Sequence, residues 1–146
     1  MFFETLGPLL ARAGQVLDTD VRARVSDEFG LRQLDAVALI VSEIGFAWTG
    51  LFAALAEQNG ILAEALAEAD ARLGSAPLRT ESGADPLAVN RELLGEVATA
   101  IQLFHERDDS AGAALLRSRL REAAEVENRL LSQARAASPL GQVRRV

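Results

Sequence analysis

The stretch that decides the fold is AVALIVSEIGFAWTGLFAALA, residues 36–56, in which Glu43 is the one charged residue. It lies inside a longer segment, residues 31–73, whose apolar residues recur at spacings of three, four and seven. This period is typical of one face of an α-helix. Because the phase continues across Gly60 without a jump, we predict a single helix approaching about 60 Å at 1.5 Å per residue. A helix of that length needs neighbours along all of it, which favours self-association.

A short helix is predicted before the long one. It begins at Pro8, whose ring presets a helical φ, and runs to about Leu17. The acidic run Asp18-Thr19-Asp20 is typical of the residues that cap the start of a helix. We therefore place the start of the long helix just after this run.

Two further helices are predicted after the long one. Residues 74–85, GSAPLRTESGAD, are the clearest loop, and Asp85-Pro86 is typical of a cap followed by the first helical residue. The helical pattern weakens at residues 108–110, where a last helix begins. It ends near Ser138, and we expect a flexible tail over residues 138–146.

Each predicted helix carries an apolar stripe that we expect to face a shared core. The long helix contributes Leu34, Ala38, Val41, Phe52, Leu55, Leu62, Leu66, Ala69 and Leu73; the next contributes Leu87, Leu94, Val97, Ile101 and Phe104; the last contributes Leu116, Leu120, Ala123, Leu130 and Ala134. No stretch alternates apolar and polar residues as a strand would. The sequence predicts an all-α helical bundle with one long central helix, a short N-terminal helix and two more, as a single domain over residues 1–146.

Composition limits the partners and the compartment. The net charge is -6, which argues against nucleic acid or an anionic membrane as the main partner. All fifteen basic residues are arginine, as in a GC-rich bacterial genome. The N-terminus has no charged region followed by a long apolar run, so we expect a cytoplasmic protein. Residues 36–56 are long enough to cross a bilayer, but Glu43 lies inside them, and we interpret them as the central helix wrapped by neighbours on most sides.

A line of polar or small residues at seven-residue intervals follows the long helix: Asp35, Ser42, Thr49 and Ala56. This line is either the face that meets solvent, a face on which another helix approaches closely, or one wall of a ligand cleft. In the cleft interpretation, Glu43 is a carboxylate among apolar groups, beside Phe46, Trp48 and Phe52. Such a carboxyl group is suited to general acid or base chemistry, but the sequence places no second catalytic group next to it.

Most enzyme classes lack their usual residues here. The chain has no cysteine and no lysine, so thiolate nucleophiles, cysteine-ligated metals and Schiff bases are excluded. His105 is the only histidine, and no Glu-x-x-His pair of the di-iron type is formed, because Gln102 precedes it by three. We interpret His105 as a surface residue near a helix C-terminus. We predict no catalytic residue, no metal site and no cofactor.

Four features stand out along about half the chain: VRARV (residues 21–25), Trp48, AEQNGIL (residues 56–62) and NRELL (residues 90–94). With the order of elements, they resemble an uncharacterised group of small helical bacterial proteins encoded near acyl-CoA dehydrogenases or aminoglycoside-phosphotransferase-like kinases. The resemblance implies a small helical protein, and it provides no catalytic residues to carry over to this chain.

We therefore expect a non-enzymatic interaction protein, such as an adaptor, accessory subunit or chaperone, that forms a homodimer or binds another protein. The expected contact surface combines small residues of the long helix with two arginines of the last one: Gly45, Gly50, Ala53, Ala54, Arg117 and Arg121. The alternative is a bundle that binds an apolar small molecule in a cleft of several hundred Å³ near Glu43 and Trp48.

Overall fold

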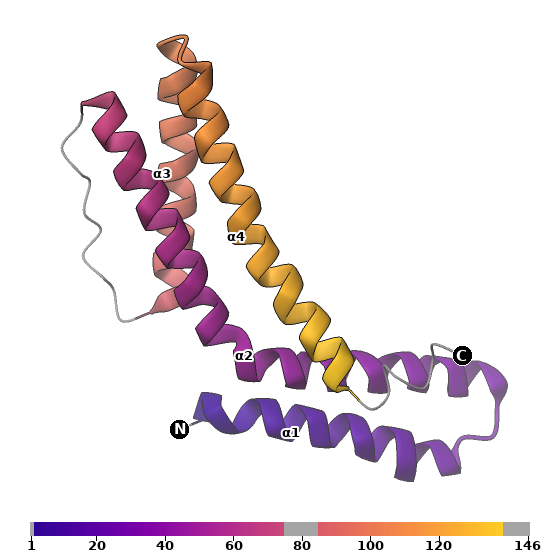
Figure 1. The fold of residues 1–146 in the computed structure, drawn as a ribbon. Helices are drawn as coiled ribbons and strands as arrows, with labels where there is room; N and C mark the ends of the chain where they lie inside the picture. The colour runs from indigo at the N-terminus through magenta and orange to yellow at the C-terminus, as the bar shows by residue number, and fades with distance from the viewer. Residues whose placement is uncertain (1, 75–84, 139–146) are drawn as a thin grey trace. The chain divides into compact units, whose positions relative to one another are not determined.

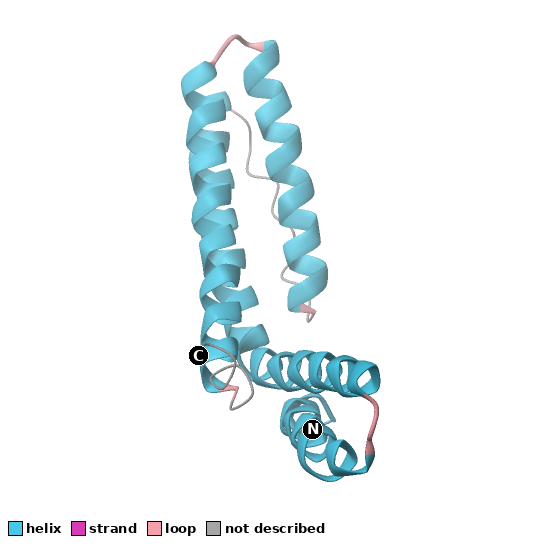
Figure 2. Cartoon of the chain, turned by 90° about the vertical axis from the view of Figure 1, so that its right-hand side faces the viewer, coloured by secondary structure: helices cyan, strands magenta, loops and turns pink. Residues whose placement is uncertain are grey.

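Alanine, leucine, glutamate and arginine lose little side-chain freedom in a helix. In the computed structural model, which describes residues 2–74 and 85–138, all regular structure of those residues is accordingly helical (Figures 1 and 2). The elements are α1 (Phe2–Val16), a π-helical turn η1 (Leu17–Val21), a 3₁₀ turn η2 (Arg22–Arg24), α2 (Glu28–Leu73), α3 (Pro86–Glu106) and α4 (Ser110–Ala137). The predicted all-α fold with one long helix is confirmed, and α2 passes through Gly30 and Gly60 unbroken.

The chain forms two compact units, to both of which α2 and α4 contribute. Unit 1 comprises Met1–Leu51 and Asn128–Val146, and unit 2 comprises Phe52–Glu127. The single domain over residues 1–146 stays a prediction. The predicted loop and tail fall largely on residues 75–84 and 139–146, which lie outside the described residues.

The start of the long helix differs from the prediction. Asp18, Thr19 and Asp20 lie inside the π-helical turn η1, which has no side-chain cap. The residue that caps α2 is Asp27, whose Oδ1 accepts a hydrogen bond from the Gly30 amide at 2.6 Å. The first amides of a helix have no acceptor within the helix, and a side-chain oxygen of the capping residue can accept from the amide three positions later. Asp27 does so for Gly30, whereas residues 18–20 lie in η1, which has no side-chain cap. Helix α1 also begins before Pro8, which lies in its interior.

Later boundaries follow the prediction. Asp85 caps α3, its Oδ1 accepting from the Leu87 amide at 3.0 Å, and Pro86 is the first helical residue. Between α3 and α4, Asp108 takes a positive φ of 54°, and Asp109 Oδ1 accepts from the Gly112 amide at 2.9 Å. These contacts end one helix and begin the next within three residues.

Unit 2 is a three-helix bundle whose core combines large apolar side chains with alanines. Its core includes residues from the end of α2, from α3 and from the start of α4: Leu62, Ala65, Ala69, Leu93, Val97, Ala100, Phe104, Ala113, Leu116 and Ala123. Phe104 is fully buried, and its ring packs closely on Gly112. A Cβ atom on Gly112 would lie only 2.5 Å from two carbon atoms of this ring. Leu87 and Leu94, which were expected in the core, are 49% and 43% exposed; Leu93 and Ala100 are buried instead. The other three residues of the expected stripe lie as predicted, because Val97 and Phe104 are buried and Ile101 packs against the core.

Unit 1 is packed through small residues. Helix α1 lies along α2 (Figure 1), and a Cβ on Gly14 would stand 2.9 Å from the Ala38 carbonyl oxygen. A Cβ atom on Gly45 would overlap the Ala11 amide nitrogen and lie 2.7 Å from the Gly7 carbonyl oxygen. Ser42 is fully buried and shares a 3.0 Å hydrogen bond with Ser138 beyond the end of α4. The line of small residues on α2 is thus, within unit 1, a face on which another helix approaches closely.

We predict that Gly45→Ala destabilises unit 1 while Gly60→Ala does not harm the chain. The first adds a methyl group against backbone atoms that cannot move aside, which costs about 1–3 kcal/mol. The second adds a methyl group where no atom lies within 4 Å, and removing a helical glycine there stabilises by about 0.5–1 kcal/mol. Urea unfolding followed by Trp48 fluorescence and far-UV circular dichroism measures both. Equal effects of the two substitutions would contradict the close approach of α1 and α2.

A second prediction concerns acid. Arg72 donates to both carboxylate oxygens of Asp109, at 2.5 and 3.0 Å, and with the Gly112 amide holds the pKa of Asp109 below its usual 3.8. A group whose pKa is lowered by folding stabilises the fold above its unfolded pKa, and this contribution disappears as the pH falls through the lowered value. Asp109→Asn should therefore lower the urea midpoint at pH 7, with the difference shrinking below about pH 3.8. Asp108→Asn, which removes the same charge without the Arg72 pair, is the control and should change the midpoint less.

Candidate functional site

Large apolar side chains of unit 1 lie on the outside of α2. Val37, Ile40 and Ile44 are 50%, 55% and 47% exposed. With Ala47 and Leu51, which are half-buried, they recur at spacings of three and four, the pattern of a helix that pairs with another helix. At about 100° per residue, this stripe lies about 150° around α2 from the face that packs on α1. The apolar stripe is therefore turned away from α1.

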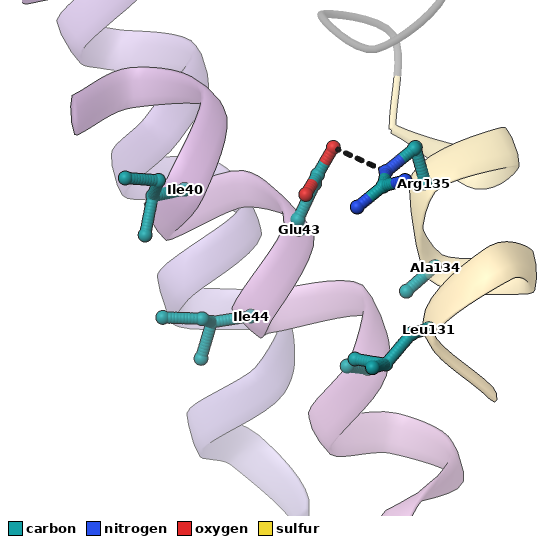
Figure 3. Close-up of a pocket in the computed structure, with 7 residues that line it drawn as sticks. Ile40, Glu43, Ile44, Leu131, Ala134 and Arg135 are labelled. Atoms are coloured by element: carbon teal, nitrogen blue, oxygen red, sulfur yellow. Dashed lines mark ion pairs between the residues drawn. The ribbon is translucent and has the colours of Figure 1, made fainter. Parts of the chain in front are cut away.

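The end of α4 completes this surface. Helix α4 runs antiparallel to α2 in unit 1, since Leu130 lies against Gly50 and Ser138 against Ser42. Its Leu131 is 49% exposed and, with Ala134, lines a groove between the two helices together with Ile40, Ile44 and Ala47 of α2 (Figure 3). The groove has a volume of about 130 Å³. We call Val37, Ile40, Ile44 and Leu131 the apolar face.

Two charges stand at the edge of the groove. Glu43 Oε1 lies 3.5 Å from Arg135 Nε, and the two side chains are 24% and 61% exposed. In Figure 3, Ile40 and Ile44 extend from one side of α2, while Glu43 points to Arg135. An exposed ion pair of this kind contributes at most about 1 kcal/mol to stability. Its effect here is to make the rim of the groove polar and electrically neutral.

The predicted ligand-binding residues differ in their surroundings, and the binding of a ligand by them stays a prediction. Of Glu43, Phe46, Trp48 and Phe52, only Glu43 lines the groove. Phe46 and Trp48 are half-buried, and Phe52 belongs to unit 2, where it is 44% exposed. The guanidinium of Arg135 also replaces the purely apolar surroundings that the general acid or base hypothesis needed.

The predicted interaction residues also have different surroundings. Gly45 is buried against α1, and a Cβ on Gly50 would stand 2.6 Å from Leu130. Both therefore serve packing within the chain. Ala53 is exposed and Ala54 half-buried, in unit 2.

Arg117 and Arg121 are exposed on the part of α4 that belongs to unit 2. Arg117 Nη2 lies 2.7 Å from His105 Nε2, and Arg121 Nε donates to the Arg117 carbonyl oxygen at 3.4 Å. A guanidinium can only donate, so the imidazole nitrogen that faces it is the acceptor. His105 is an exposed residue, as expected.

The sequence interpretation missed Ile40, Ile44, Leu131 and Arg135. Residues 36–56 were expected to be wrapped by neighbours on most sides, and this is wrong for the single chain, because Val37, Ile40 and Ile44 are half-exposed. The signal was present as the second apolar stripe, residues 37, 40, 44, 47 and 51. Helical spacing alone does not distinguish this stripe from the one through Leu34, Ala38 and Val41, which we predicted to face the core.

Among the described residues, no three His, Cys, Asp or Glu side chains are grouped so as to hold a metal ion. Within the same residues, α2 is the one helix long and apolar enough to cross a membrane, with a mean hydropathy of 1.7 in an 18-residue window of which 17% is buried. Length and composition alone do not separate a membrane span from a helix covered by protein.

Compared with protein-family models, curated proteins and solved structures, the chain matches none of them. The resemblance to the bacterial group stays a prediction, and function has to be argued from the apolar face itself.

Proposed function

We propose that this chain is a non-enzymatic interaction protein that self-associates through the apolar face. The observation that carries the proposal is the exposure of Val37, Ile40 and Ile44 at coiled-coil spacing, next to Leu131. Monomeric soluble proteins rarely expose several large apolar side chains side by side, and such patches mark interaction sites. A helix face with this spacing fits another helix.

The energy available is of the right order. Fully burying a valine, leucine or isoleucine side chain contributes about 1.5–3 kcal/mol, so covering a half-exposed one contributes about half of that. The apolar face offers four such side chains, and in a dimer each of them counts twice. This is enough for one charged substitution in the face to weaken association strongly.

The groove favours a protein partner over a small molecule. Its volume is about 130 Å³. Pockets for small molecules usually measure about 300–1,000 Å³. One side chain of a partner helix fits this space better than a whole ligand does.

The test is the mass of the chain in solution and the effect of one charge. We expect a sedimentation mass near twice 15.6 kDa for the wild type and near 15.6 kDa for Ile40→Glu. Because Ile40 is 55% exposed, a glutamate there leaves the circular dichroism spectrum unchanged.

Leu9→Glu is the matched control. Leu9 is 60% exposed in unit 1 but lies on the side of α1 opposite Gly7, Ala11 and Gly14, which face α2. This variant should stay dimeric. A monomeric wild type, or dissociation by Leu9→Glu with Ile40→Glu still dimeric, would rule out the proposal.

A further inference from the structure

We infer that two copies of this chain pair α2 against α2 in antiparallel orientation, with Ile40 of each copy opposite Ile44 of the other and Val37 opposite Ala47. The inference rests on the proposed function and specifies the geometry of the dimer. In this geometry a second copy of the chain occupies the groove. Helix α2 of that copy packs on Ile40, Ile44 and Ala47, which line the groove.

The first argument is the match of large and small side chains. In an antiparallel pair whose two-fold axis passes near residue 42, Val37 of one copy lies against Ala47 of the other. Ile40 of each copy then lies against Ile44 of the other. Interfaces pack densely when large side chains face small ones. A parallel pair would place Ala47 against Ala47 and leave a gap beside the groove.

The second argument is the position of α4. The end of α4 lies on one side of the apolar stripe, where Leu131 and Ala134 form the groove wall. A two-fold axis perpendicular to two antiparallel helices leaves both α4 segments on the same side of the pair, so the two Leu131 side chains add to one shared apolar layer. In a parallel pair they would lie on opposite sides, and each Leu131 would remain half-exposed. A two-fold interface uses the same patch on both copies, as required here.

The third argument is charge. On the side of α4, the antiparallel pair brings two Glu43 carboxylates to one rim. Each Glu43 arrives with its own Arg135 at 3.5 Å, so the four charges sum to zero. On the other side, the next positions of the repeat are Leu34, Val41 and Trp48, all half-buried and apolar, and these widen the contact.

The test uses the absence of cysteine from the chain, which lets single cysteines be placed without background. Val37→Cys and Ala47→Cys are prepared separately, one with a tag that changes its mass, then mixed, exchanged and oxidised mildly. In the antiparallel dimer, residue 37 of one copy faces residue 47 of the other. Two copies of residue 37 lie about ten residues apart along the axis, about 15 Å. A disulfide needs Cα atoms within about 7 Å.

We expect about tenfold more disulfide-linked heterodimer in the mixture than linked homodimer from either variant alone. Linked homodimers of each variant alone, with no excess in the mixture, would establish a parallel pair and overturn the geometry while leaving the proposed function intact. A wild-type chain that is monomeric at every concentration would reject the proposed function. A chain that sediments with phosphatidylcholine vesicles and forms no linked dimer would assign the apolar face to lipid and overturn both.

Discussion

The close approach of α1 to α2 is the constraint on which the rest of unit 1 depends. Gly14 and Gly45 bring backbone atoms of the two helices into contact, and any side chain larger than hydrogen at Gly45 would overlap the Ala11 amide. A contact made by glycine and serine buries little apolar area, so the stability of the α1–α2 contact comes from close packing rather than from large side chains. The Ser42–Ser138 hydrogen bond adds a second connection, between α2 and the residue after α4. Val37, Ile40 and Ile44 of α2 are left on the opposite face.

The two units differ in how they are held together. Among the described residues, the largest fully buried side chains of unit 2 are Phe104, Leu62, Leu116 and Val97, whereas those of unit 1 are Ser42 and Ser138. Unit 2 therefore has an ordinary hydrophobic core. In unit 1, Val41, Phe46 and Trp48 are half-buried. Val37, Ile40 and Ile44 are about half-exposed, so part of their apolar area stabilises the chain only when something covers it. The same helix α2 supplies both units, which explains how one sequence pattern can hold two apolar stripes with different purposes.

The helices could be predicted from the sequence, but the groove and the apolar face could not. The continuity of α2 through Gly60 and the cap at Asp85 follow from local rules, namely helical phase and the need of free amides for an acceptor. The groove does not, because it depends on where Leu131 of α4 comes to lie beside Ile44. Helical periodicity locates a stripe on one helix but gives no information on which of two stripes a distant segment will cover. Glu43 was selected because it is the one charge in an apolar run, and its partner Arg135 lies 92 positions later.

The same exposed stripe could also be covered by lipid. The charges of Glu43 and Arg135 favour a second copy of the chain over a membrane span. A membrane span of about 20 residues centred on the apolar run of α2 would place Glu43 in the hydrocarbon, at a cost of about 2.5–3.5 kcal/mol for an acidic group. Arg135 would have to follow it, because separating a buried pair leaves an uncompensated charge. A second copy needs to cover only residues 37–51, and it leaves Glu43 and Arg135 at the rim, in contact with water and with each other. Pairing of two copies, as we propose, would remove the apolar side chains from water without removing these charges, whereas a membrane span through Glu43 would remove both.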